Sequence, residues 1–429
     1  MLFRRRNRGE PARWRGLLRL LGPGLITGAS DDDPSGIATY SQAGAQFGYA
    51  LGWVLLFSWP LMAAIQEISA RIGRVTGRGI AGNLREHYPR PLLRVVVGLL
   101  LVANIINLGA DLGAMGDAVR LLLGGVPGSY VVLFAVLCAT LEVFLSYDNY
   151  VRLLKWTTLS LFAYVATALV VGAPWRTVMH DVVVPRIVWD SDYLVVIVAV
   201  LGTTISPYLF FWQASEEAED ERINPAAHPL TETPDEAKRE IRRIEFDTYV
   251  GMGLSNLVAL FIMITTAATL HRHGITDIQT AEQAAQALHP IAGPFAFAVF
   301  TCGIVGTGLL AVPVLAGSAA YALAEAMGWP VGLGRRPREA KAFYATIVVG
   351  TLIGVTINFI SLDPIKALFW AAVINGVVAV PLMVVMMLMT MRPEIMGPFV
   401  LPRPLQALGW LSTAVMAAAV VAMLATWSG

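Results

Sequence analysis

Hydrophobic residues of this chain gather in long runs, and short polar stretches that carry most of the charges separate these runs. A bilayer core about 30 Å thick requires roughly 20 apolar residues per helix. The pattern therefore predicts an all-α polytopic membrane protein. Its eleven predicted transmembrane helices lie at about 17–46, 49–72, 92–118, 129–149, 153–173, 192–217, 247–270, 291–326, 342–361, 366–390 and 405–427.

Basic residues are divided unevenly between the two faces that these spans define. With the N-terminus inside, 26 of the 31 Lys and Arg residues fall in cytoplasmic segments, as the positive-inside rule requires. Omitting one internal helix would spoil this division. We predict a multi-pass protein of the inner (plasma) membrane with a cytoplasmic N-terminal segment at 1–16, no cleavable signal peptide and an extracytoplasmic C-terminus. The five outer basic residues are Arg120, Arg176, Arg186, Arg272 and Lys366.

Composition excludes several classes of protein. Hydrophobic residues make up 56% of the chain and charged residues only 14%, against about 25% charged in soluble domains, which excludes a soluble enzyme, a disordered chain and a nucleic-acid-binding domain. The 2 cysteines lie in apolar runs, so no disulfide framework or cysteine metal site is expected. All 6 histidines lie in loops or at span ends, and neither His-Glu-x-x-His nor a phosphate-binding loop is present. We expect that the protein is not an enzyme, needs no cofactor and has no obligate protein partner.

Two spans are interrupted at mid-depth. In the first, three carboxylates (Asp31 to Asp33) precede Pro34 and Gly36; each charge costs at least ~2.5 kcal/mol there, and proline removes a helical hydrogen bond. The sixth span reads Leu201-Gly-Thr-Thr-Ile-Ser-Pro-Tyr. A simple kink explains the sixth break equally well when it is taken alone. Together, however, two breaks five spans apart are typical of an inverted-repeat transporter with its substrate site between them, and the half-helix C-terminal ends favour a cation.

Four motifs resemble the NRAMP family of divalent-metal transporters. They are Gly22-Pro-Gly, Asp33-Pro-Ser-Gly-Ile-Ala-Thr, Gln42-Ala-Gly-Ala-Gln-Phe-Gly-Tyr and Gln66-Glu-Ile-Ser-Ala-Arg-Ile-Gly-Arg-Val-Thr-Gly. The first 90 residues match closely, and the eleven-span topology extends the resemblance over the whole chain. It implies a LeuT-like 5+5 inverted repeat with broken helices 1 and 6. We expect one transporter domain at 17–429, with a first repeat at about 17–173, a second at about 192–390 and an extra helix at about 405–427.

The resemblance also implies a set of metal ligands, from which this chain departs. The family holds its ion with the Asp and Asn of Asp-Pro-Gly-Asn and with an Ala carbonyl and a Met thioether in Ala-x-x-Met-Pro-His. Here Asp33 keeps its place, Gly36 replaces Asn, Thr203 replaces Ala, Ser206 replaces Met and Tyr208 replaces His. Oxygen ligands without a thioether suit hard cations. A roomier site suits Mg²⁺, which keeps several waters.

The proton relay that the resemblance implies is depleted. The family's third-helix Asp-x-x-Glu reads Asp111-Leu-Gly-Ala here, so Ala114 replaces the Glu, and residues 343–360 contain no counterpart of the ninth-helix Arg. These departures resemble the NRAMP-related Mg²⁺ transporter (NRMT-like) branch, which implies transport without proton coupling. A divalent ion can then enter along the membrane potential.

Other polar residues in the spans have two explanations each. Asn375 has the type and depth of an ion ligand, but a helix-to-helix hydrogen bond explains it equally well. Asn104 and Asn107 share one face of the third span and form either a wet path with Asp111 or a packing contact. Asp31 and Asp32 either attract the ion or cap the half-helix. The hydrophilic stretch 216–247 is predicted to be a solvated connector rather than a metal sensor.

The sequence therefore predicts an importer of Mg²⁺, with Mn²⁺ tolerated, that works by alternating access as a proton-uncoupled uniporter. One alternative is a proton-coupled Mn²⁺/Fe²⁺ symporter with Asp111 as the proton acceptor. Another is a sodium-coupled transporter of organic solutes, although clustered aspartates would repel a carboxylate substrate. The predicted metal ligands are Asp33, Gly36, Thr203, Ser206 and Asn375, and the predicted pathway residues are Asp31, Asp32, Tyr208, Asp111, Asn104 and Asn107.

Overall fold

The computed structural model describes residues 27–28, 30–126, 128–144, 161–223, 228–359 and 363–427, and all regular structure among them is helical. Seven helical segments in this part of the chain are long and apolar enough to cross a membrane, and two shorter apolar helices accompany them. Each of the eleven predicted spans contains helix where it is described, which confirms the all-α membrane fold. The predicted cytoplasmic segment at 1–16 lies outside the described residues.

One set of helices lies along the predicted spans, and short helices lie between some of them. Those along the spans are α3 (Pro34–Phe47), α4 (Gly52–Thr76), α6 (Arg90–Leu123), α7 (Ser129–Phe144), α9 (Phe162–Val170), α11 (Ser191–Thr204), α12 (Pro207–Ile223), α13 (Ala237–Thr269), α16 (Ala296–Met327), α17 (Lys341–Ile357), α18 (Pro364–Thr390) and α20 (Arg403–Thr426). The short ones are α5 (Ile80–His87), α10 (Trp175–Val183), α14 (Ala281–Gln286), α15 (His289–Ala292) and α19 (Pro393–Met396), together with 3₁₀ turns at Pro234–Glu236, His271–His273, Gly293–Phe295 and Gly397–Phe399.

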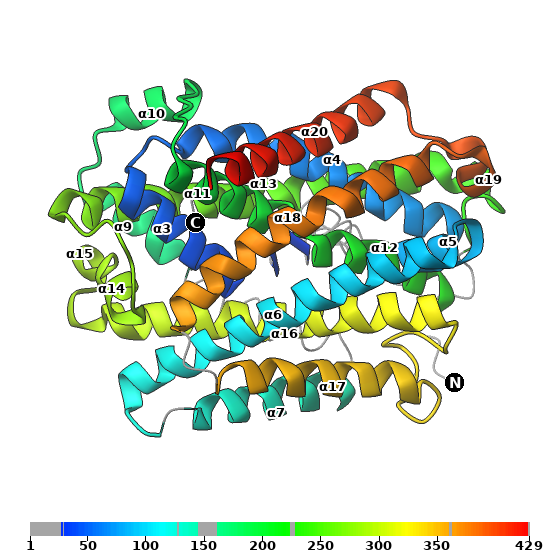
Figure 1. Cartoon of the computed structure of the whole chain (residues 1–429), viewed down its shortest axis with the longest axis horizontal. Coiled ribbons are helices and arrows are strands. Elements are labelled where there is room, and N and C mark those ends of the chain that lie inside the picture. Colours follow the sequence, from blue (N-terminus) through cyan, green and yellow to red (C-terminus); the bar gives the residue numbers. More distant parts are fainter. Residues whose placement is uncertain are drawn as a thin grey trace, which may run out of the picture.

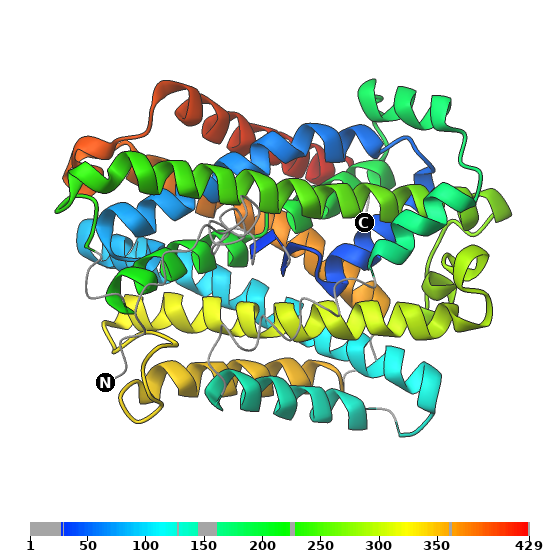
Figure 2. The same ribbon diagram turned by 180° about the vertical axis from the view of Figure 1, so that it is seen from behind.

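The central helices of the bundle are α3, α11 and α18. Helix α3 packs against α11, α13 and α18, and α11 also packs against α18 and α20. Figure 1 shows α18 crossing this centre obliquely, with α6 and α16 beside it and the pair α7 and α17 at one edge. Seen from behind, α13 runs along the length of the molecule over the same centre (Figure 2). The two predicted breaks therefore lie inside the bundle.

The stretch 216–247 differs from the predicted solvated connector at both of its ends. Helix α12 continues to Ile223 and α13 begins at Ala237. Glu217 is 1% exposed and lies 2.5 Å from the Arg243 guanidinium, while Glu221 is 6% exposed and lies 2.7 Å from that of Arg74. Buried charges need such partners. The prediction was wrong at these ends because opposite charges on α4, α12 and α13 neutralise one another inside the fold.

Candidate metal-ion site

Asp33 lies at the first break, where it is the N-cap of α3. Its Oδ1 accepts hydrogen bonds from the Ser35 hydroxyl at 2.7 Å and from the Gly36 backbone N–H at 2.6 Å. Pro34 occupies the first helical position and needs no hydrogen-bond acceptor there. The positive end of the helix stabilises the carboxylate. The sequence Asp-Pro-Ser-Gly thus holds a carboxylate, 1% exposed, at mid-depth in the protein.

The second break lies between α11 and α12 and faces the first. The Ser206 hydroxyl donates to the carbonyl oxygens of Gly202 and Thr203, each at 2.8 Å, and α12 starts at Pro207. A Cβ placed on Gly36 would lie 3.2 Å from the Thr203 hydroxyl. The missing side chain at position 36 therefore lets the two breaks approach each other closely.

A buried polar network joins Asp33 to three other spans. The Asn107 side-chain amide donates to Asp33 Oδ2 and to Asp111 Oδ2, both at 3.1 Å, and the Asn375 amide donates to Asn107 Oδ1 at 2.9 Å. The Tyr208 hydroxyl lies 3.4 Å from Asp33 Oδ2. Spans 3 and 6 thus contact the carboxylate of span 1 directly, and span 10 joins the network through Asn107.

Two oxygens of this network have no hydrogen-bond partner among the described residues. They are Oδ1 of Asp111 and Oδ1 of Asn375. Asp111 is 0% exposed and Asn375 is 1% exposed. Buried polar atoms are nearly always hydrogen-bonded, because an unpaired one costs free energy. A cation bound beside Asp33 would supply a partner to such oxygens.

The other predicted pathway residues point elsewhere. Asp31 and Asp32 turn toward α13, where the Ser255 hydroxyl lies 2.5 Å from Asp31 Oδ2 and 3.2 Å from Asp32 Oδ1. The Asn104 amide donates to the Leu315 carbonyl of α16 at 3.1 Å. Of the two explanations for Asn104, the structure thus favours a packing contact between helices over a wet path. No hydrogen bond joins Asn104 to Asn107 or Asp111.

Sequence reasoning missed Ser35 and Ser255 as members of this region. Ser35 could have been found, because a hydroxyl two residues after a helix-capping aspartate often bonds to it. Ser255 gives no such signal, because it is one of several hydroxyl residues in its span and the sequence does not single it out. Only the packing of α13 on α3 brings it to the aspartates.

Membrane-spanning helices with two facing breaks around a buried carboxylate define a transporter of cations. The chain matches the family described as "Nramp: Natural resistance-associated macrophage protein-like" over residues 24–426, and it belongs to this family. It is 29% identical over 426 residues to the divalent metal cation transporter MntH of Deinococcus radiodurans, covering 96% of this chain and 91% of the relative. The MntH of Klebsiella pneumoniae (strain 342) is 28% identical, with 93% and 92% covered.

Solved structures show the same fold. The Eremococcus coleocola manganese transporter, in complex with an aromatic bis-isothiourea substituted compound, aligns with a TM-score of 0.71 at 18% identity over 97% of this chain and 88% of that chain. MhsT in complex with L-phenylalanine aligns with a TM-score of 0.62 at 12% identity over 94% and 97%. The LeuT-like fold with broken helices 1 and 6 is therefore confirmed.

The family also confirms the functional class. Nramp proteins are transporters and not enzymes, so this chain is a multi-pass membrane transporter of divalent metal cations. The ligand roles of Asp33, Gly36, Thr203, Ser206 and Asn375 stay predictions.

Proposed function

We propose that the protein imports Mg²⁺, tolerates Mn²⁺ and works as a uniporter without proton coupling. The observation that carries this proposal is the chemistry beside Asp33: the hydrogen-bonded groups there are carboxylates, side-chain amides and hydroxyls. Such oxygen ligands suit Mg²⁺ and Mn²⁺ rather than soft late transition metals. Ser206 adds a hydroxyl at the second break instead of a thioether.

In the proposed site, Asp33 is the anionic ligand. Asn375 supplies its unpartnered amide oxygen and Thr203 its backbone carbonyl, which the Ser206 hydroxyl would release. The predicted room for water at Gly36 is wrong, because a Cβ there would lie 3.2 Å from the Thr203 hydroxyl and 3.3 Å from the Asp31 carbonyl oxygen. Mg²⁺ sheds its waters reluctantly, so its remaining waters would lie on the side of Asp33 Oδ2. Asp31 and Asp32 attract the ion, and Asn107, Asp111 and Tyr208 line its path.

Two features support uncoupled transport. Ala114 stands one turn after Asp111, where a second acid would be needed, and the Tyr208 hydroxyl is hydrogen-bonded to the Ser30 carbonyl at 2.9 Å. The driving force is the interior-negative potential, worth about 2.3 kcal/mol per charge per 100 mV. We propose an inner-membrane location with the N-terminus in the cytoplasm, because 26 of the 31 basic residues then lie inside.

A reconstitution experiment tests this proposal. The purified protein in liposomes is supplied with Mg²⁺ or Mn²⁺ while an internal dye reports pH. We expect Mg²⁺ uptake at unchanged internal pH, with Mn²⁺ as a weaker substrate. Mn²⁺ uptake with matching acidification and no Mg²⁺ uptake would contradict the proposal.

One observation favours a second candidate, a proton-coupled Mn²⁺ transporter. Asp111 keeps one carboxylate oxygen unpartnered and is joined to Asp33 through Asn107, so it is placed to accept a proton when the metal binds. In the liposome experiment, an Asp111→Asn variant would then lose the acidification while the unaltered protein shows it. Under the uniport proposal neither protein acidifies the vesicles.

A further inference from the structure

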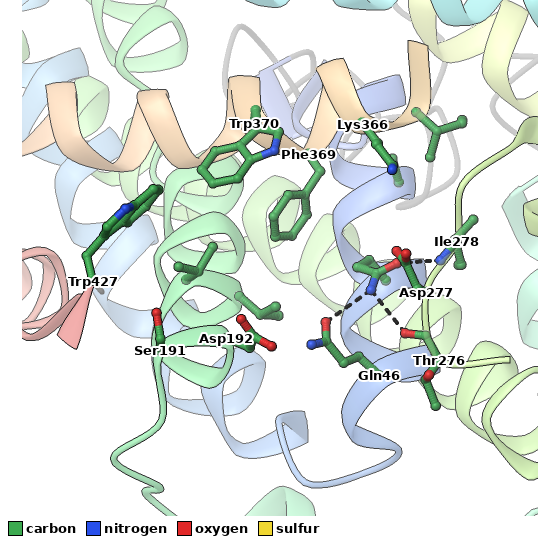
Figure 3. Close-up of a pocket in the computed structure, with 15 residues that line it drawn as sticks. Gln46, Ser191, Asp192, Thr276, Asp277, Ile278, Lys366, Phe369, Trp370 and Trp427 are labelled. Carbon is green, nitrogen blue, oxygen red and sulfur yellow. Dashed lines mark hydrogen bonds between the residues drawn. The ribbon is translucent and has the colours of Figure 1, made fainter. Parts of the chain in front are cut away.

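A cavity of about 680 Å³ opens at the predicted outer face, away from the aspartates of the first break. Figure 3 shows its polar side chains converging from separate elements. Gln46 comes from α3, Asp192 from α11, Asp277 from the segment before α14 and Lys366 from α18. We call this cavity the outer chamber.

The outer chamber lies on the same three helices that carry the proposed ligands. Ala38, Val196 and Phe369 line it. Ala38 follows Asp33 by five residues, which is roughly 7.5 Å along a helix at about 1.5 Å per residue. At about 30 Å³ per water, the volume accommodates a cation with its complete hydration shell. A hydrated ion can therefore wait here, one to two helical turns from the site.

Both carboxylates of the outer chamber are held in place by the fold. Asp192 lies in the first turn of α11, where the positive end of the helix stabilises it. Asp277 is positioned by Gln42 of α3, whose amide donates to the Thr276 carbonyl at 3.2 Å and accepts from the Ile278 N–H at 2.9 Å. The two acids thus line the cavity from different elements.

Lys366 is the cation among these groups, and its position is electrostatically unfavourable. It lies in the first turn of α18, whose N-cap Asp363 accepts from the Ile365 and Lys366 backbone N–H groups at 2.9 and 3.3 Å. A positive side chain at this end of a helix costs about 0.3–1 kcal/mol. No carboxylate in the described part of the chain lies within 4.0 Å of its ammonium group, so the charge is free to act on the cavity.

We propose that Lys366 sets the apparent affinity of the outer face for divalent cations. Its ammonium group weakens the field of Asp192 and Asp277 and repels the incoming hydrated cation. Charges that line a cavity change the local concentration of ions within it. The inference rests on the proposed orientation, in which the outer chamber faces away from the cytoplasm.

Sided uptake in whole cells tests the role of Lys366. In Lys366→Gln we expect the KM for external Mg²⁺ to fall about threefold or more at low ionic strength, with kcat unchanged. The difference in KM between the variant and the unaltered protein should shrink above 0.1 M salt, because the Debye length is then about 10 Å or less. Asp192→Asn should raise the KM. The matched control is Arg176→Gln, which removes an exposed charge on α10 outside the chamber. An unchanged KM in Lys366→Gln, or an equal shift in the control, would overturn the proposal.

A thiol experiment separates charge from structure. Lys366→Cys is made in a Cys302→Ser background, because Cys302 is exposed and Cys138 is buried. A membrane-impermeant cationic methanethiosulfonate added outside should return the KM to its original value, and an anionic one should lower it further. Equal effects of both reagents would refute the electrostatic role. If Mg²⁺ uptake proceeds but only reagents on the cytoplasmic side modify the cysteine, the proposed orientation fails while metal transport stands.

Discussion

Asp33 combines two roles that a single carboxylate can fill because its oxygens point in different directions. Oδ1 caps α3 through Ser35 and Gly36, and Oδ2 meets Asn107 and Tyr208. Ser35, Gly36 and Asn107 donate to these oxygens, and the single Tyr208 hydroxyl proton is shared between Asp33 and the nearer Ser30 carbonyl oxygen. A cation that approaches from the Oδ2 side can take over these contacts without unravelling the helix end.

Removal of this carboxylate tests the site. In Asp33→Ala, we expect the apparent affinity for Mg²⁺ to fall about tenfold or more, which corresponds to roughly 1.4 kcal/mol, because no other anionic oxygen lies in the same position. Mg²⁺ uptake by vesicles measures the effect. The matched control is Asp117→Asn, whose carboxylate is paired with Arg120 at the outer end of α6 and should leave uptake unchanged. Normal uptake by Asp33→Ala would remove the site assignment.

Residue 206 tests selectivity. In Ser206→Met, a thioether replaces a hydroxyl at the second break, and we expect competition by Mn²⁺ or Cd²⁺ against Mg²⁺ to strengthen by about tenfold, since soft ligands favour softer ions. The change also removes two hydrogen bonds to the Gly202 and Thr203 carbonyls. Ser206→Ala removes the same bonds without adding sulfur, so an equal change in both variants would contradict the ligand role.

At the scale of the helices, the proposed ion site depends on close approach between α11 and α18. A Cβ on Gly202 would lie 2.1 Å from the Ala372 carbonyl oxygen and 2.5 Å from the Gly376 nitrogen. These two backbones therefore touch directly one residue from Thr203 and one from Asn375. Small residues at such contacts are how membrane helices pack closely, and here they set the width of the site.

A larger residue at this contact should separate the helices. For Gly202→Val we expect a loss of about 1–3 kcal/mol of stability, because the added atoms meet backbone that cannot turn aside. Thermal unfolding of the detergent-solubilised protein, followed by size-exclusion chromatography, measures it. Gly98→Ala on α6 is the matched control, since a Cβ there meets nothing within 4 Å, and it should keep or raise the melting temperature. Equal melting temperatures of the two variants would contradict this account.

At the scale of the whole molecule, the distribution of basic residues predicts the orientation, and the membrane potential would supply the driving force. In the predicted topology 26 of the 31 basic residues lie on one face, and the aspartates of the first break lie buried. A divalent ion that crosses toward the interior gains about 2.3 kcal/mol per charge per 100 mV. Such a gain is sufficient for accumulation without a second ion.

We expect Mg²⁺ uptake to depend on voltage and not on the proton gradient. In liposomes with a potassium gradient and valinomycin, Mg²⁺ uptake should rise severalfold as the interior becomes negative. A pH gradient imposed at clamped voltage should leave the rate unchanged. The control is vesicles without valinomycin, in which the potential collapses as Mg²⁺ enters. A rate that follows the pH gradient at clamped voltage would favour the symporter.

The sequence predicts the helix breaks but not the contacts between side chains of different spans. The breaks at Asp33 and at Ser206-Pro207 follow from local chemistry, because proline and a capping carboxylate end helices wherever they stand. The role of Asn107 could not be read in this way. Asn107 forms hydrogen bonds with Asp33 and Asn375, which lie 74 and 268 residues away along the chain. Nothing in the residues next to Asn107 specifies these two partners.

The sequence by itself determined the membrane class, the helical spans, their predicted direction, the two breaks and the family. These properties depend on hydrophobic length and on local backbone chemistry, which are written in consecutive residues. Only the tertiary structure decided that Asn107 joins Asp33, Asp111 and Asn375, that Asn104 packs against α16 instead, and that Asp31 and Asp32 share Ser255. It also placed Lys366 with two carboxylates in one cavity. The reason is that side-chain partners across a bundle are set by helix rotation and crossing, to which every packed residue contributes.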